Sequence, residues 1–227
     1  EHIFGDDGFR SVYGNKYMSN KFLNTFSYTL NEVFRNKIKC KFAIGYDTRF
    51  SNKEIFNKIT KYLQNNITII DLGIVTLGQL SYEINKNKFY IGIMITASHF
   101  HYSYNGIKIL NHLGEKIEPS FEKRLEKKIK TNLNNYNNLK FSFQEFRKLH
   151  NYNSNYHLFI KKNLINLKKR YLIDCANGSA SKLFKSIGRI KMFKYINNNS
   201  NGKNINLKSG AFYYLKKNLI SNLDYTI

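Results

Sequence analysis

The chain has 227 residues, of which 42% are hydrophobic and 15% aromatic. This composition supports a packed core and excludes an intrinsically disordered chain. Lysine and arginine number 37 against 15 acidic residues, which gives a formal net charge of +22 and raises nucleic acid or an anionic membrane as partners. The basic residues are spread along the whole chain among many asparagines. We therefore expect solvated basic faces that suit small anionic substrates, without a specific nucleic-acid partner.

Compartment and membrane association follow from a few simple features. Cys40 and Cys175 lack metal-type spacing and are expected to be buried free thiols in a reducing compartment. The longest apolar run, residues 89–97, is too short to cross a bilayer, and no signal peptide is recognisable. We expect a cytoplasmic protein with no membrane partner. The chain begins with Glu1 rather than methionine, so some N-terminal sequence is expected to be missing.

The first part of the chain alternates short apolar runs with helical patterns. A helix capped by Ser19 is expected over residues 19–35. The expected strands and helices that follow are 42–46, 53–64, 67–71, 77–85 and 90–95, in β-α-β-α-β order. A short strand at 107–110 and a helix at 120–133 complete this part. The order predicts an α/β domain over residues 1–135, with a mixed, largely parallel sheet flanked by helices.

The second part, residues 136–227, repeats this alternation. An asparagine-rich stretch at 132–138 is expected to be a flexible connection, and a linker helix follows near 154–167. The further expected elements are a strand at 171–174, a turn at 176–178, a helix at 179–187 ended by Gly188, a strand at 191–196, a helix around 211–220 and the start of a strand at 224–227. We expect a second, similar but incomplete α/β domain.

The segment from Gly92 to Lys108 carries the strongest chemical signal. A buried strand delivers Thr96, Ser98 and His99 into a polar loop at its carboxyl end, where open α/β sheets bind ligands. Asn105 and the glycine after it supply a sharp turn before Lys108. A hydroxyl beside an imidazole and an ammonium is a plausible arrangement for phosphoryl transfer, although a loop of ordinary turn residues explains the pattern about equally well.

This segment also resembles a known family. Thr96-Ala-Ser-His99 followed by Tyr104-Asn-Gly-Ile-Lys108 is similar to the phosphoserine loop of the α-D-phosphohexomutases, which usually reads T/S-A-S-H-N-P. In that family the serine is phosphorylated and its phosphate binds Mg²⁺. Phe100-His101 replaces the usual Asn-Pro here. The proline's fixed φ is therefore lost, which puts the rigidity of the loop in question.

Three other segments resemble the same family in the same order. Phe4-Gly-Asp-Asp-Gly-Phe-Arg-Ser11 is similar to F-G-T-D-G-I-R-G, and Gly45-Tyr-Asp-Thr-Arg49 is similar to G-x-D-x-R. By this resemblance Arg10 and Arg49 lie near the phosphoserine and stabilise its charge. The stretch from Asp174 to Ser181 resembles the opening of the family's second domain. Each segment alone is also explained by turn chemistry.

A last stretch favours one branch of the family. Asn204-Ile-Asn206 with Ser209-Gly210 is similar to N-I-N-x-x-C-G-S of phosphoglucosamine mutases, with Lys208 in place of the cysteine. The resemblance implies an isomerase of carbohydrate and cell-wall precursor metabolism, which interconverts glucosamine 6-phosphate and glucosamine 1-phosphate through a bisphosphate intermediate. Ser98 would carry the phosphate and contact Mg²⁺ through it. His99 and Lys108 would orient the group and transfer protons. Thr96 and Asn105 would support the phosphate.

One expected feature of that family is missing. The other Mg²⁺ ligands come from an aspartate loop, D-G-D-x-D-R, and this sequence contains none. We therefore expect a fragment, or a decayed protein that keeps the fold without the full chemistry. The alternatives are a phosphomannomutase or phosphoglucomutase, a non-catalytic remnant that binds a partner or a sugar phosphate, and a basic nucleic-acid-binding protein.

Overall fold

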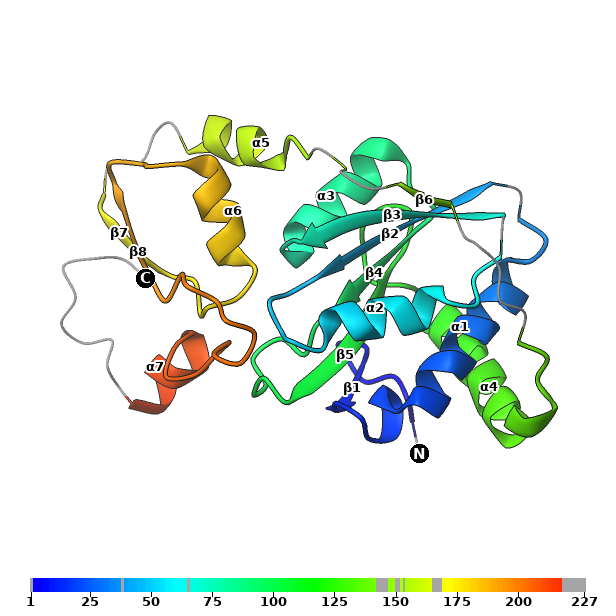
Figure 1. Cartoon of the computed structure of the whole chain (residues 1–227). Coiled ribbons are helices and arrows are strands. Elements are labelled where there is room, and N and C mark those ends of the chain that lie inside the picture. Colours follow the sequence, from blue (N-terminus) through cyan, green and yellow to red (C-terminus); the bar gives the residue numbers. More distant parts are fainter. Residues whose placement is uncertain are drawn as a thin grey trace.

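Two separate sheets organise the structure, a computed structural model that describes residues 2–37, 39–64, 66–141, 147–149, 152, 154–164 and 169–217 (Figure 1). The six-stranded sheet consists of β1 (Phe9–Val12), β2 (Cys40–Tyr46), β3 (Ile67–Ile74), β4 (Ile91–Ile95), β5 (Tyr104–Leu110) and β6 (Arg147–Leu149). The helices beside it are α1 (Asn20–Phe34), α2 (Asn52–Thr60), α3 (Leu77–Asn87) and α4 (Pro119–Asn134), with 3-10 turns at Lys16–Met18 and Tyr136–Asn138.

The strand order is β1-β5-β4-β2-β3-β6. The pairs β4–β2, β2–β3 and β3–β6 are parallel, whereas β5 runs antiparallel to β4 and β1. The chain passes from β2 to β3 on one side and returns to β4 on the other side of β2. The carboxyl ends of β2 and β4 therefore lie next to each other where the strand order reverses, which is the usual ligand position in open α/β sheets.

Both faces of the six-stranded sheet are buried. On one face Phe42 and Ile44 pack in a cluster with apolar residues of α1, α2 and α4. On the other face Ala43 and Met94 pack against Leu80 of α3. Successive strand residues point to opposite faces, so a strand covered on both sides needs a continuous apolar run. This explains why the apolar runs of β2 and β4 predicted buried strands correctly.

Helix starts follow the expected capping chemistry. The Ser19 hydroxyl accepts a hydrogen bond from the Phe22 amide at 3.3 Å and caps α1, as predicted. Thr76 caps α3 in the same way through the Gln79 amide at 3.1 Å. Each cap satisfies a backbone donor that the first turn of a helix leaves without a partner.

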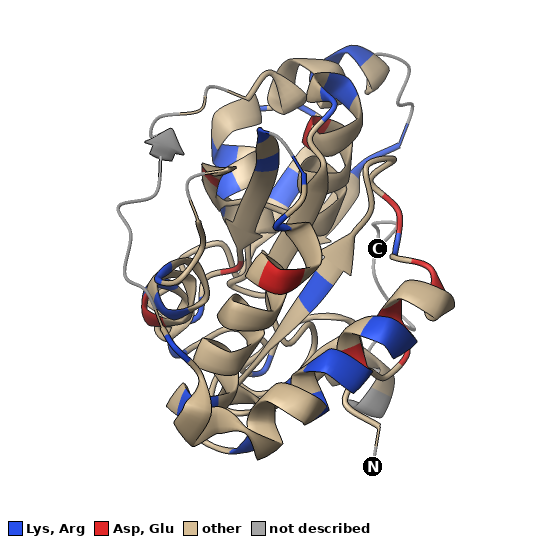
Figure 2. Cartoon of the chain, turned by 90° about the vertical axis from the view of Figure 1, so that its right-hand side faces the viewer, with Lys and Arg blue, Asp and Glu red and all other residues tan. Residues whose placement is uncertain are grey.

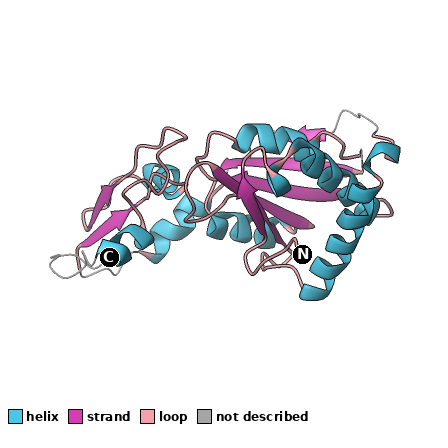
Figure 3. Cartoon of the chain, turned by 90° about the horizontal axis from the view of Figure 1, so that it is seen from below, coloured by secondary structure: helices cyan, strands magenta, loops and turns pink. Residues whose placement is uncertain are grey.

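The second sheet has two parallel strands, β7 (Tyr171–Asp174) and β8 (Phe193–Ile196), in the order β7-β8. The other elements of this unit are α5 (Tyr156–Asn163), α6 (Ala180–Ile187) and α7 (Ala211–Lys217). Helix α6 connects the two strands, so the unit repeats the β-α-β pattern, and the two groups of strands stand apart in Figure 3. This arrangement confirms the predicted fold class.

Several sequence-based expectations need correction. Residues 132–138 do not form a simple connection, because α4 runs to Asn134 and a 3-10 turn follows. Asn132 is buried and donates to Thr29 and Glu32. The helix expected over 53–64 ends at Thr60. The edge strands β1 and β6 were not predicted. The expected ends of two helices, at 165–167 and 218–220, and the strand at 224–227 lie outside the described residues.

The division of the chain after residue 135 stays a prediction. Strand β6 lies beyond that point in the sequence, yet it pairs with β3 of the first sheet. The first unit of the molecule therefore uses some residues from the predicted linker.

The two cysteines are buried and free, as expected, and the charged residues are spread over several elements. Cys40 and Cys175 are buried and free, and burial raises the pKa of both thiols, that of Cys175 to about 11 with a further contribution from Asp174. Lysine and arginine occur on several helices, strands and loops in Figure 2, with acidic residues between them. Among the described residues, no helix is both long and apolar enough to span a bilayer.

Candidate functional site

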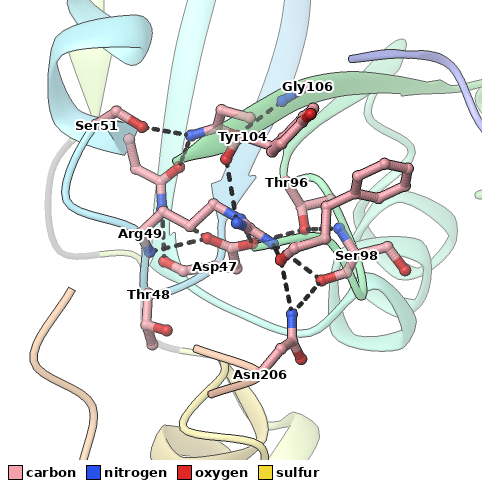
Figure 4. A network of polar contacts seen from close by, with 12 residues as sticks. Asp47, Thr48, Arg49, Ser51, Thr96, Ser98, Tyr104, Gly106 and Asn206 are labelled. Atoms are coloured by element: carbon pink, nitrogen blue, oxygen red, sulfur yellow. Dashed lines mark hydrogen bonds and ion pairs between the residues drawn. The ribbon is translucent and has the colours of Figure 1, made fainter. Parts of the chain in front are cut away.

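Ser98 lies in the loop that follows β4, at the carboxyl edge of the sheet (Figure 4). The residue is exposed, and its backbone has a φ of 55°. A non-glycine residue in the left-handed region stores strain of about 1–3 kcal/mol, and such strain is concentrated at functional sites. The surrounding contacts hold this conformation in place.

Thr96 links the serine loop to the neighbouring strand. Its hydroxyl donates to the Asp47 carboxylate at 2.7 Å and accepts from the Ser98 amide at 3.0 Å. Asp47 follows β2 and is 4% exposed. Asp47 also accepts from Asn52 Nδ2 at 2.9 Å. Thr96 therefore contributes to the site by fixing the backbone at Ser98.

Arg49 lies behind the loop and is buried, with a side chain that is 0% exposed. Its Nε donates to Asp47 at 3.0 Å. The two terminal nitrogens donate to four loop carbonyls, those of Ser98 (3.0 Å), Phe100 (2.9 Å), His101 (2.5 Å) and Tyr104 (3.1 Å). A guanidinium has five N–H donors, and these bonds use all five. Burial lowers the pKa of Arg49, and the neighbouring Asp47 carboxylate partly offsets this effect. The guanidinium stays charged at neutral pH.

These contacts bear on the loop's departure from the family pattern. Phe100 and His101 stand where the family usually has Asn-Pro, and both carbonyls accept from Arg49. The Phe100 amide also donates to the Ala97 carbonyl at 3.1 Å. Hydrogen bonds to one buried arginine thus supply conformational restraint that a proline would supply through its fixed φ.

Asn105 is fully buried, with an exposed fraction of 0%. Its side-chain nitrogen Nδ2 donates to the Ser51 hydroxyl and to Asn52 Oδ1, each at 2.8 Å. Its side-chain oxygen Oδ1 accepts from the Gly106 backbone amide at 2.9 Å. The next residue must be small, because a Cβ on Gly106 would lie 2.5 Å from the Phe9 carbonyl oxygen. Asn105 therefore joins the start of α2 to the start of β5 rather than facing solvent.

Arg10 and Lys108 form a second cluster around one carboxylate. Arg10 lies 2.9 Å and Lys108 lies 3.3 Å from Asp7. Burial raises the pKa of Asp7, but Lys108 and Arg10 more than offset this and hold it below the usual 3.8. The Arg10 guanidinium also lies 5.0 Å from the ring centre of Phe100, which connects this cluster to the serine loop. Two cations against one anion leave a net charge of about +1, which suits an anionic group.

His99 points to a different neighbour. Its ring stacks on Phe212 of α7, with ring centres 4.1 Å apart and planes inclined by 18°. His99 is exposed, and Phe212 has an exposed fraction of 51%. The imidazole is therefore oriented by the second unit of the molecule.

The second unit also contacts the loop directly. Asn206 Nδ2 donates to the carbonyls of Ser98 (2.8 Å) and Phe100 (3.1 Å). Sequence reasoning singled out Asn206 and Asp47 only as members of motifs that resemble the family. It missed Asn52 entirely. Asp47 had a readable signal, because it is a polar side chain directly after the buried strand β2. Asn52 is the first residue of α2 and had no such signal.

The predicted site residues thus fall into three connected groups. Hydrogen bonds connect Ser98, Thr96 and Arg49. Arg10 and Lys108 both form ion pairs with Asp7. The ring of His99 stacks on that of Phe212. Asn105 lies beneath the first group. The fold and site define an α/β protein with an exposed serine at the carboxyl edge of its central strands, where open α/β sheets bind ligands, and with a cationic cluster beside it.

Comparison with known proteins identifies the family. Residues 1–136 match the phosphoglucomutase/phosphomannomutase family, α/β/α domain I. Phosphoglucosamine mutase of Francisella philomiragia is 31% identical over 215 residues, which span 92% of this chain and 48% of that protein. Phosphoglucosamine mutase of Prochlorococcus marinus is 33% identical over 224 residues, 93% of this chain and 47% of that protein. The chain therefore belongs to the phosphoglucomutase/phosphomannomutase family, and it spans about half the length of the curated relatives it matches.

Solved structures agree on the fold. A phosphoglucomutase/phosphomannomutase family protein of Burkholderia thailandensis superposes with a TM-score of 0.65 at 16% identity, over 88% of this chain and 45% of that chain. The phosphoglucomutase parafusin of Paramecium gives 0.67 at 16% identity, over 88% and 44%. At such identity the likeness shows the fold alone.

Proposed function

We propose that this chain carries the phosphate-bearing serine of a cytoplasmic phosphoglucosamine mutase, an intramolecular phosphotransferase that interconverts glucosamine 6-phosphate and glucosamine 1-phosphate. The observation that supports this best is Ser98 itself. It is exposed at the carboxyl edge of the sheet, held at a φ of 55°, and fixed by Thr96 and Arg49. Strain maintained by so many contacts at a ligand-binding edge favours a chemical role over an ordinary turn.

In the proposed reaction the phosphoryl group starts on Ser98 Oγ. A free hydroxyl of the sugar phosphate attacks phosphorus, the bond from phosphorus to Ser98 Oγ breaks, and the hydroxyl proton passes to a base. The resulting sugar bisphosphate reorients, and its other phosphate returns to Ser98 Oγ by the reverse steps. His99 and Lys108 are proposed to orient the group and move the proton. Arg10 and Lys108, with a net charge of about +1 around Asp7, would offset the charge of the transferred group.

Arg49, Thr96 and Asn105 take supporting roles in this proposal. Arg49 has its donors on loop carbonyls, so it would position the serine rather than bind the phosphate directly. Thr96 would hold the Ser98 amide, and Asn105 would fix the strand that returns from the loop.

The family resemblance implies Mg²⁺, which would neutralise charge on the transferred phosphate. Within the described residues, no three His, Cys, Asp or Glu side chains gather in a way that could hold a metal. Asp47 is hydrogen-bonded to Arg49 and Thr96, and Asp7 is paired with two cations. Mg²⁺ prefers near-octahedral ligation by oxygen atoms. The phosphate on Ser98 would supply one of these oxygen ligands, and the others would have to come from elsewhere. The described part of this chain therefore does not form a complete magnesium site.

The choice of sugar rests on the relatives. Both curated relatives described above are named phosphoglucosamine mutases, which favours a hexosamine phosphate over mannose or glucose phosphate. A bisphosphorylated sugar would be the intermediate.

The test is to incubate the chain with glucose 1,6-bisphosphate and Mg²⁺ and to locate the phosphate by tandem mass spectrometry. Ser98→Ala should abolish the label, because the acceptor hydroxyl is gone. Ser103→Ala, in the same loop, is the matched control and should keep it. Label on another residue, or none on any residue, would contradict the proposal.

A further inference from the structure

Two carbonyl oxygens in the serine loop are shared between the two units of the molecule. The Ser98 carbonyl accepts from Arg49 at 3.0 Å and from Asn206 at 2.8 Å. The Phe100 carbonyl accepts from the same two side chains, at 2.9 and 3.1 Å (Figure 4). A carbonyl oxygen has two lone pairs. Each of these oxygens is therefore saturated by one donor from the first unit and one from the second.

Asn206 is built into its own unit before it reaches the loop. Its φ is 60°, a conformation that asparagine tolerates better than most residues. The backbone amide of Asn206 donates to the Ala176 carbonyl at 2.9 Å, which connects Asn206 to the turn after β7. The neighbouring Asn204 accepts from the Asn201 amide and donates to the Asn199 carbonyl, each at 2.9 Å. The asparagine-rich stretch thus presents a preformed donor.

Two further hydrogen bonds bring the units together beside this point. The Thr48 hydroxyl donates to the Asn177 carbonyl at 2.6 Å, and the Phe50 amide donates to the Gly202 carbonyl at 3.0 Å. Both contacts flank Arg49 in the sequence. Space is restricted as well, because a Cβ on Gly202 would lie 3.3 Å from Phe50 Cβ. The second unit therefore docks on the segment that holds the serine loop from behind.

We propose that Asn206 is a positioning residue that makes the conformation of the Ser98 loop depend on docking of the second unit. Arg49 donates one hydrogen bond to each of the two carbonyl oxygens from the core. Asn206 donates the second hydrogen bond to each of them only while the second unit is docked. The consequence for catalysis rests on the proposed function, in which Ser98 must present its phosphate at a fixed angle. Correct orientation of reacting groups is a large part of the effect of an enzyme on its reaction.

The side-chain chemistry selects sharp variants. Asn206→Asp keeps the shape but replaces both N–H donors with an oxygen that faces two carbonyl oxygens. Asn206→Gly removes the donors without penalising the positive φ, because glycine populates that region freely. Asn199→Ala alters an exposed asparagine of the same segment and serves as the matched control.

The experiment is hydrogen exchange of the chain without phosphate, followed by mass spectrometry. In both Asn206 variants, amides of residues 97–104 should exchange about tenfold faster, as expected from losing one or two neutral hydrogen bonds. Exchange in β7 and β8 should stay at the wild-type rate, and Asn199→Ala should change neither region. Unchanged exchange of 97–104 would overturn the proposal. Equally faster exchange of β7 and β8 in both variants would also overturn it, because the substitutions would then destabilise the second unit as a whole.

A spectroscopic arm tests positioning itself. With phosphoserine incorporated at position 98, the ³¹P resonance should shift or broaden in Asn206→Gly and match wild type in Asn199→Ala. An identical resonance in all three proteins would overturn the positioning role. The proposed function can fail separately: if Ser98 takes no phosphate from a sugar bisphosphate, the exchange result still stands. Unchanged exchange would remove this inference and leave Ser98 as the phosphate carrier.

Discussion

Asp47 and Asp174 both lie at the carboxyl end of a parallel strand, yet their carboxylates accept hydrogen bonds from different kinds of donor. Asp47 follows β2, is 4% exposed, and accepts from the Arg49 guanidinium and the Thr96 hydroxyl. Asp174 ends β7, is half-buried, and accepts from the amides of Ala176 (2.8 Å) and Gly210 (2.6 Å) and from Asn197. Asp47 thus neutralises a buried cation, whereas Asp174 accepts hydrogen bonds from neutral donors in the turns of its own unit.

The difference indicates how each unit keeps its shape. The turn at Asp47 lies on a sheet with apolar clusters on both faces, and the side chain of its partner Arg49 is fully buried. The second unit has few buried apolar side chains among the described residues, namely Cys175, Ile187 and Ile205. Its turns depend more on hydrogen bonds, which each contribute less than a buried apolar side chain. Two substitutions test this contrast, and a titration of Asp7 tests the smaller contribution of an exposed ion pair.

The largest effect is expected from Asp47→Asn. The change keeps the shape but leaves the Arg49 guanidinium buried without its counter-ion, which typically costs about 3–5 kcal/mol. Urea unfolding followed by circular dichroism measures the loss. Asp6→Asn, at an exposed aspartate, is the control and should lie within about 0.5 kcal/mol of wild type. A loss below about 1 kcal/mol in Asp47→Asn would contradict the role assigned to this ion pair.

A smaller and more local effect is expected from Asp174→Asn. The variant keeps one acceptor oxygen and loses the other, so a donor of the turn is left without its partner at a cost of about 1–3 kcal/mol. Hydrogen exchange should accelerate in β7 and β8 and stay unchanged in β2 and β4. Equal acceleration in both sheets would mean that the two units unfold together, and the contrast between them would be lost.

The smallest effect concerns pH and the exposed carboxylate of Asp7. Its folded pKa is depressed below 3.8, because Lys108 and Arg10 outweigh the effect of burial. The sign follows directly: the stabilisation is present above the unfolded pKa and is lost as pH falls through the folded pKa. The side chain is 53% exposed, so solvent screening keeps the contribution small. An NMR titration of the Asp7 carboxyl carbon should have its midpoint below 3.8, and a midpoint at or above that value would contradict the ion-pair cluster.

Local sequence determined more of the sheet than of the site. Apolar runs predicted β2, β3 and β4, because strands covered on both faces need such runs. The short strand β7 was predicted too, although its residues are only half-buried. Ser19 and Gly188 marked helix ends correctly, because capping depends on neighbouring backbone groups. The position of Ser98 at a strand's carboxyl end was also readable. The edge strands β1 and β6 are short, and they pair with strands far away in the sequence.

Only the tertiary structure decided what the polar side chains of the site do. Arg49 was expected to face the phosphate, and the structure places its five donors on Asp47 and the backbone of residues 98–104. Asn206 meets the carbonyl of Ser98 across 108 residues of chain. A motif fixes which donors are present and which strand end they follow. It cannot fix their acceptors, because hydrogen-bond partners so distant in sequence meet only after the sheet order and the docking of the second unit are set.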